Sequence, residues 1–199
     1  MNAIIRGQIC KSEIVLSASE LSARLGRPSS VTDSDVENAC REIFKVANMR
    51  FAALRLKVLS IEDNTVTLEG FSVASAALAS YFSGAEETYI FAATLGGEVD
   101  RLIMKKKALS LSEGFLFDAV ASALTEAVCD AAEKKISLGE TFKNRFSPGY
   151  ADCPLSVQRD LLGILCADKH IGIKLLDSLL MAPMKSVSAF IAIKEKNGN

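Results

Sequence analysis

The stretch RFSPGYADCP, residues 145–154, combines a permanent positive charge with two prolines and a glycine. Pro148 and Gly149 fit the two central positions of a type II turn that runs from Ser147 to Tyr150, because proline fixes a negative φ and glycine accepts a positive one. Such a turn holds its backbone amides and carbonyls in fixed positions. The stretch therefore predicts a rigid corner in the chain.

The side chains of this corner suit a small charged ligand. Arg145 offers a planar fork of donors that can bind a carboxylate or a phosphate at two points. Gly149 leaves the main chain accessible, and Tyr150 can cover a ligand with its ring face and its hydroxyl. An amino-acid-like or nucleoside-like molecule fits this description. The alternative is purely structural: Arg145 pairs with Asp152 or Glu140, and Tyr150 belongs to the core.

The longest predicted helix, 111–136, precedes this corner. Ser110 and Glu113 form a capping box at its start, and apolar residues cover most of its surface, so we expect it at the centre of the core. Its polar residues form one stripe: Asp118, Ser122, Glu126, Asp130 and Glu133. Spacing by one turn along an exposed face explains this stripe without a function.

The rest of the chain mixes helices and strands without a regular β-α-β alternation. Helical spacing or capping signals predict helices in 20–25, 33–49, 72–82, 96–109, 111–136 and 154–169. Alternating or continuous apolar runs predict strands in 50–61, 65–73, 88–96, 170–175 and 186–195. This pattern favours an α+β fold with a twisted, mainly antiparallel sheet flanked by helices. We expect a single domain over 1–199, with a helical N-terminal part at 1–49 and a sheet-and-helix core at 50–195.

Composition excludes several classes of function. The chain has 199 residues, 49% of them hydrophobic, and a formal net charge of −1, so it lacks the broad basic surface that nucleic acids select. We find neither a signal-peptide layout nor an apolar stretch long enough for a membrane span, and we therefore expect a cytoplasmic protein with no membrane partner. Five cysteines without a CxxC pair argue against a disulfide framework and a zinc site.

Three other features can be interpreted in two ways. Cys153 is either a nucleophile or a packed thiol, and packing beside Pro154 is the favoured interpretation. His170, the single histidine, can act as an acid or stack on a cofactor, although a structural role is more common. The lysines within 104–109 either dock an acidic partner or complement the dipole at the end of their helix.

RFSPGY followed by ADCP resembles the Arg-x-Ala/Ser-Pro-Gly-Tyr and Cys-Pro motif of the activation domain of cobalamin-dependent methionine synthase. Further segments resemble successive parts of that family in the same order: YIFAATLGGEVDRLI, DAVASALTEAVCDAAEKKI and DKHIGIKLLDSLLMAPMKSVSAFI. The resemblance covers roughly residues 70–193, and the hairpin before it resembles the small stand-alone members.

This resemblance implies a binding site for S-adenosylmethionine. In the family, the domain helps to rescue methionine synthase after its cobalamin has been oxidised to the inactive cob(II) form. An electron from a flavodoxin-type donor and a methyl group from S-adenosylmethionine then regenerate methylcobalamin. Carried over residue by residue, Arg145 would bind the methionyl carboxylate, Ser147 and Gly149 would offer backbone contacts, and Tyr150 would pack on the ligand.

The resemblance also implies a partner protein. The Asp-x-His-x-x-Gly signature of cobalamin-binding modules is absent from the sequence, so the cobalamin would be held by a separate methionine synthase that lacks its own activation domain. Domains fused to the full synthase also contribute an N-terminal acidic residue and a C-terminal tyrosine, for which we find no convincing counterpart. The alternative is a ligand-free scaffold or interaction module of another corrinoid methyltransferase system.

Overall fold

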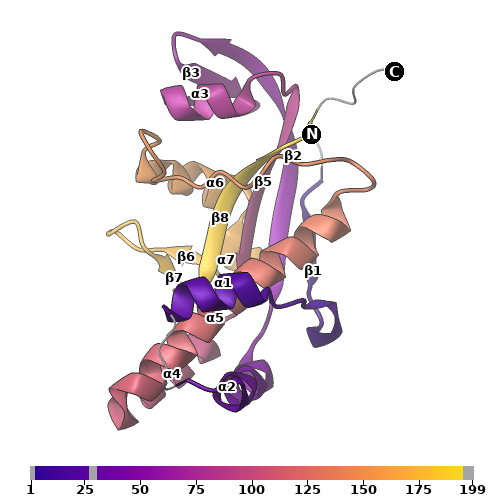
Figure 1. Ribbon diagram of the computed structural model, residues 1–199. Helices are drawn as coiled ribbons and strands as arrows, with labels where there is room; N and C mark the ends of the chain where they lie inside the picture. Colours follow the sequence, from indigo (N-terminus) through magenta and orange to yellow (C-terminus); the bar gives the residue numbers. More distant parts are fainter. Residues whose placement is uncertain (1–2, 27–30, 195–199) are drawn as a thin grey trace.

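The computed structural model describes residues 3–26 and 31–194, and its centre is a six-stranded antiparallel sheet (Figure 1). Its strands are β1 (Ile5–Gln8), β2 (Arg50–Glu62), β3 (Thr65–Leu68), β4 (Phe71–Ala74), β5 (Glu87–Thr94) and β8 (Ser186–Ala192). They run in the order β4-β3-β2-β5-β8, and β1 pairs with the first residues of β2. Two short strands, β6 (Lys174–Leu175) and β7 (Met181–Ala182), form a separate ladder.

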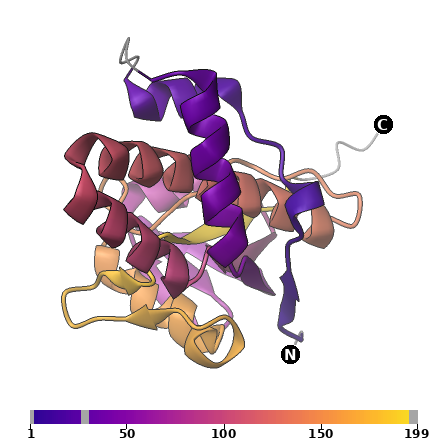
Figure 2. The ribbon, with the colours of Figure 1, turned by 90° about the horizontal axis from the view of Figure 1, so that it is seen from below.

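Helices cover both faces of the sheet. They are α1 (Ala18–Leu25), α2 (Asp33–Val46), α3 (Ala76–Phe82), α4 (Gly97–Leu109), α5 (Leu111–Ile136), α6 (Gln158–Ile164) and α7 (Ala167–His170), with short 3-10 turns η1 (Lys11–Glu13) and η2 (Leu155–Val157). Figure 1 shows α5 crossing one face of the sheet obliquely, with α6 on the other side. At the lower end, α2 and α4 lie side by side (Figure 2).

Strand β5 is buried on both faces, as its continuous apolar run predicts. Tyr89 and Phe91 pack in the cluster that contains α5, whereas Ile90 and Ala92 pack in the cluster that contains α3 and α6. Each fully buried side chain of Phe or Ile size contributes ~1.5–3 kcal/mol to folding. The sheet therefore separates two apolar layers, and the predicted α+β class with a mainly antiparallel sheet is confirmed.

Helix α5 has the bounds that the sequence predicts. The Ser110 hydroxyl accepts a hydrogen bond from the Glu113 amide over 3.3 Å, which satisfies one free donor of the first turn. Further along this turn, a Cβ atom added at Gly114 would lie 2.6 Å from the Lys107 Cα. The backbones of α4 and α5 can approach this closely only because residue 114 has no side chain.

Several boundaries differ from the predicted ones. The predicted strand 65–73 is divided into β3 and β4, because Gly70 adopts a φ of +106° and turns the chain. The predicted helix 154–169 is interrupted at Cys166, whose φ of +46° ends α6 and begins α7. The predicted strand 170–175 is wrong for most of its length, since only Lys174 and Leu175 form a strand, and Ile171 and Ile173 are buried from the irregular segment before it.

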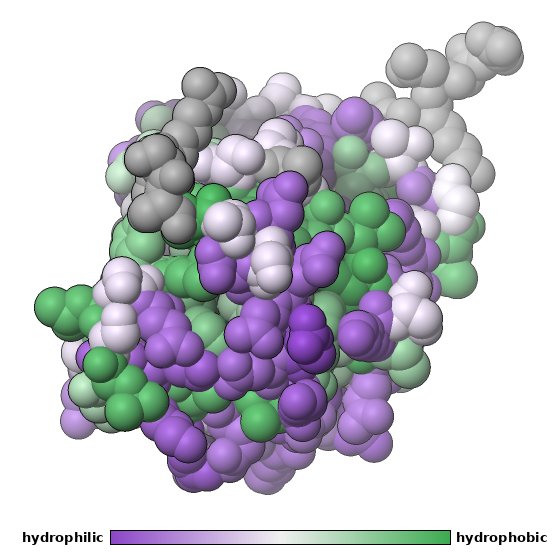
Figure 3. Space-filling model, turned by 60° about the horizontal axis from the view of Figure 1, so that its bottom comes forward, coloured by the Kyte–Doolittle hydropathy of each residue, from purple (hydrophilic) through white to green (hydrophobic). Residues whose placement is uncertain are grey.

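The surface carries both hydrophilic and apolar side chains. On the face turned toward the reader in Figure 3, hydrophilic side chains spread over the centre and the lower part, and apolar side chains emerge between them. The described helices include none with the length and apolar character required to span a membrane.

Candidate functional site

The corner at residues 145–154 contains the predicted turn. The Tyr150 amide donates to the Ser147 carbonyl over 3.2 Å, and Gly149 has a φ of +86°. The Gly149 amide donates to the Cys153 carbonyl over 2.9 Å, which closes the corner from the other side. These hydrogen bonds hold the backbone of the motif in one conformation.

Asp152 fastens this corner to the start of helix α3. Its carboxylate accepts hydrogen bonds from the Ser75 hydroxyl over 2.6 Å, the Ala76 amide over 2.7 Å and the Ala77 amide over 3.1 Å. The bond from Ser75, followed by those from Ala77 and Ala76, lowers the pKa of Asp152. The expected alternative pairing of Arg145 with Asp152 is therefore wrong.

Arg145 is bound by three carboxylates of α5. Its Nη2 donates to Glu126 Oε2 over 2.8 Å, and its Nη1 donates to Asp130 Oδ1 over 2.9 Å and to Glu133. The side chain of Arg145 is only 19% exposed. Glu140, the other expected alternative partner, pairs with Arg55 over 3.0 Å instead. Arg145 is thus paired internally, but with partners that the sequence analysis did not name.

The spacing on α5 explains why the three carboxylates converge. Glu126, Asp130 and Glu133 lie four and three residues apart, so they project from one face of the helix. Glu126 also lies 3.4 Å from Arg24 of α1. Burial raises the pKa of Glu133, and the positive charge of Arg145 opposes that rise. The polar stripe that the sequence explained as a solvated face is therefore partly an ion-pair site.

Two open cavities flank this cluster, each of a size that small ligands use. One, of about 450 Å³, is lined by Arg145, Ser147 and the three carboxylates. The other, of about 460 Å³, lies beyond Asp130 and Glu133 and extends toward Val15. The structure thus brings two of the four predicted site residues, Arg145 and Ser147, to a cavity wall.

The other two predicted site residues lie next to that wall. Gly149 and Tyr150 do not line the cavity beside Arg145. The Tyr150 side chain is 66% exposed and packs edge-on against Phe146, with 5.6 Å between ring centres. The alternative of a core tyrosine is therefore wrong, and the ring is accessible from solvent.

The other candidates from the sequence are Cys153, His170 and the lysine run, and each has neighbours that give it a structural role. Cys153 is buried, and burial raises the pKa of its thiol, which disfavours the reactive thiolate. His170 ends α7, and its Nδ1 lies beside the Arg6 guanidinium. In the lysine run, Lys106 pairs with Glu42 over 3.0 Å and lies over the Phe117 ring.

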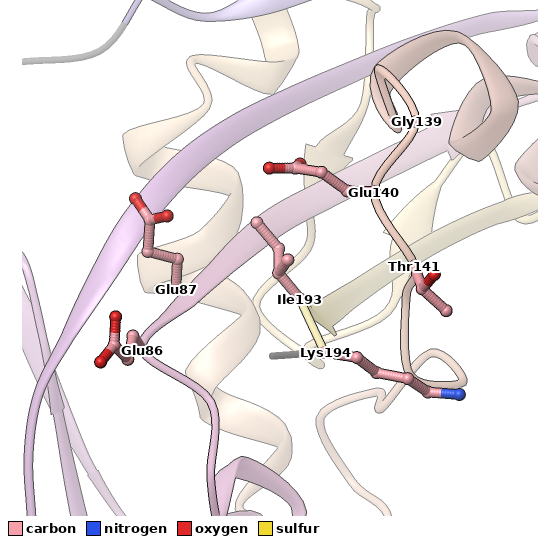
Figure 4. A pocket seen from close by; sticks show the side chains of 7 residues that line it. All are labelled: Glu86, Glu87, Gly139, Glu140, Thr141, Ile193 and Lys194. Atoms are coloured by element: carbon pink, nitrogen blue, oxygen red, sulfur yellow. The ribbon is translucent and has the colours of Figure 1, made fainter. Parts of the chain in front are cut away.

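A third cavity, of about 240 Å³, lies away from the motif (Figure 4). Its lining includes Glu86, Glu87 and Glu140, whose carboxylates appear as sticks in Figure 4. Arg55 pairs with both Glu87 and Glu140, so two of these carboxylates share one positive charge. Within residues 3–26 and 31–194, His, Cys, Asp and Glu side chains form no group that could hold a metal ion.

Comparison with known proteins identifies the family of this corner. Residues 79–197 match the family model described as vitamin B12 dependent methionine synthase, activation domain, a match that spans more than half of the chain and includes the whole motif. The chain belongs to this family.

The activation-domain fold extends beyond the matched segment. A solved structure of the MetH reactivation domain bound to AdoHcy superposes with a TM-score of 0.70 and 15% sequence identity, covering 100% of this chain and 80% of that one. At this identity the likeness establishes the fold of the activation domain for the whole chain. No curated protein matches the sequence.

Proposed function

We propose that the protein binds S-adenosylmethionine at the Arg145 corner and supports the reductive reactivation of a cobalamin-dependent methionine synthase on a separate chain. The observation that carries this proposal is the position of Arg145. It belongs to the motif of the family, and its guanidinium group lines a cavity together with the carboxylates that it binds, which suit the positive groups of such a ligand.

Binding requires an exchange of partners at Arg145. The methionyl carboxylate would take the place of at least one α5 carboxylate on the guanidinium. Asp130 is the most readily displaced, because its side chain is 60% exposed and water can solvate it. The displaced carboxylates would then accept hydrogen bonds from the ammonium group of the ligand. Ser147 and Gly149 would contribute backbone contacts, and Tyr150 would pack on the ligand.

The cobalamin would be bound by the partner synthase. When bound, S-adenosylmethionine supplies a methyl group, and the reaction also needs an electron from a flavodoxin-type donor. The task of this chain is to hold and orient the ligand. The partner, the donor and a cytoplasmic location are parts of the same proposal.

Calorimetric titration of the wild type with S-adenosylmethionine tests the proposal. We expect binding in the range of hundreds of micromolar, about 5 kcal/mol, and its loss in Arg145→Ala. Arg55→Ala is a matched control, because Arg55 also binds two carboxylates, but beside the cavity of Figure 4. Wild-type protein that binds no ligand, either alone or with a synthase lacking its activation domain, would contradict the proposal.

The internal pairing of Arg145 supports one other candidate function. A guanidinium that is already bound to three carboxylates is typical of a structural ion pair. A ligand-free scaffold or interaction module in another corrinoid methyltransferase system would need nothing more. This candidate predicts that Arg145→Ala lowers stability without changing any ligand binding.

A further inference from the structure

Two arginines, Arg6 and Arg50, lie at one edge of the sheet, on the face away from α5. Arg6 of β1 is directly opposite Ala52 of β2, and Arg50 comes two residues before Ala52. Residues at such positions share one face of a sheet, and Arg6 and Arg50 are diagonal neighbours about 7–8 Å apart. Ala52 packs in the cluster that contains residues of α6 and α7. Both arginines therefore project toward these two helices.

Arg50 is held in place, but its charge is not neutralised. The half-buried side chain lies against Gly172, where an added Cβ atom would be 3.0 Å from Arg50 Nη2. Gly172 has a φ of +75°, so glycine suits both the conformation and the close approach. The Nε atom of Arg50 is buried without a hydrogen-bond partner. Within residues 3–26 and 31–194 the Arg50 guanidinium forms no salt bridge, so its positive charge has no counter-ion there.

His170 adds a third polar side chain to this pair. Arg6 Nη1 is hydrogen-bonded to His170 Nδ1. Because arginine can only donate, Nδ1 accepts, and the neutral ring carries its proton on Nε2. Asp168, the one carboxylate of α7, is exposed and accepts a hydrogen bond from the next backbone amide over 2.8 Å. In the part of the chain that the structure describes, two permanent positive charges and a ring donor thus gather without an acidic partner.

We propose that Arg6, Arg50 and His170 bind a phosphate group, either the free ion or the terminal group of a phosphate monoester. Phosphate oxygens match the planar donor fork of arginine, and a charge close to −2 balances two guanidinium groups. The Nε2–H group of His170 supplies a further donor. Because Gly172 and β2 already hold Arg50, binding costs little side-chain entropy at this residue. The site lies across the sheet from α5, and it is independent of the function proposed above.

Calorimetric titration with inorganic phosphate tests the site, at constant ionic strength and with potassium chloride as the reference salt. We expect the wild type to bind phosphate with a dissociation constant of about 1 mM or lower. Arg50→Gln and Arg6→Gln should each weaken binding about tenfold, because each removes a charged donor. Arg41→Gln removes the same charge from an exposed position on α2 and should leave the affinity unchanged.

A wild type that binds no phosphate would overturn the proposal. Binding that persists in both Arg50→Gln and Arg6→Gln, or that weakens equally in Arg41→Gln, would overturn it too, since the ion would then bind elsewhere or without specificity. If Arg50→Gln proves unfolded by circular dichroism, the exposed Arg6 decides the question through Arg6→Gln. A parallel titration with methyl phosphate distinguishes the two sources: equal affinity supports a monoester, and binding of inorganic phosphate alone supports the free ion.

Discussion

The guanidinium of Arg145 lies 2.8 Å from Glu126 Oε2, which ties the loop after α5 back to the middle of that helix. Nineteen positions separate the two residues, and Asp130 and Glu133 add two further bonds to the same group. One side chain of the motif therefore connects a loop to the central helix of the fold.

Replacing Arg145 by a neutral side chain should destabilise the protein. Arg145→Met leaves three carboxylates close together without their common partner, and we expect a loss of about 2–4 kcal/mol, reduced from the value for a fully buried pair by partial solvation. Urea denaturation gives the free energy of unfolding. The double variant Arg145→Met/Glu133→Gln should recover part of the loss, and an unchanged midpoint in the single variant would contradict the pairing.

Asp152 should make stability depend on pH in acid. Its folded pKa is lowered by hydrogen bonds from Ser75 and α3, so its contribution is present above the unfolded pKa of about 3.9 and is lost as pH falls through the folded pKa. Asp152→Asn should lower the melting temperature by roughly a few degrees at pH 6. Thermal scans between pH 2 and pH 6 should show this difference shrinking toward acid; a difference that stays constant would show that the carboxylate charge is irrelevant.

Gly149→Ala should destabilise the turn. Its φ of +86° disfavours any residue with a Cβ atom, and the added atom would lie 3.0 Å from Leu155 Cδ1, so we expect a cost of about 1–2 kcal/mol. Gly163→Ala in α6 is the matched control, because an added Cβ atom there meets nothing within 4 Å and should be neutral or stabilising. Equal denaturation midpoints for both variants would refute the strain argument.

Gly114→Ala should force α4 and α5 apart. The new Cβ atom would lie 2.6 Å from the Lys107 Cα, a backbone atom that cannot move alone. We expect a loss of at least ~2 kcal/mol, measured by chemical denaturation. Ser112→Ala, at an exposed position on the same turn of α5, should cost much less. A variant at residue 114 with the stability of the wild type would show that the two helices separate easily.

The sequence predicts those elements whose signals are local. Helix α5 has a cap at Ser110 and a continuous apolar surface, and both predicted bounds are correct. The turn at Gly149 depends on neighbouring residues only. Ile171 and Ile173 alternate as in a strand, yet both are buried from an irregular segment. Two apolar residues are too few to distinguish a strand from such a segment.

The partners of Arg145 could not be predicted in the same way. A stripe of carboxylates on a helix looks the same whether it faces water or a cation from a distant part of the chain. The three acidic residues precede Arg145 by 12 to 19 positions, and only the packing of the loop against α5 brings them together. The sequence does not predict strand β1 for a related reason. Its four residues are too few to show an alternating pattern, and they pair with β2, which lies far along the chain.

The separation between Arg145 and Glu126 along the chain means that the RFSPGYADCP motif cannot keep its environment when it is moved to another protein. A ten-residue peptide with the sequence RFSPGYADCP would retain the guanidinium and the Pro-Gly pair, but it would lack the counter-charges of α5 and the helix start that holds Asp152. Grafting the loop onto another scaffold would transfer the conformation of the turn without the carboxylates that neutralise Arg145. The smallest transferable unit therefore includes the central helix and α3 together with the motif.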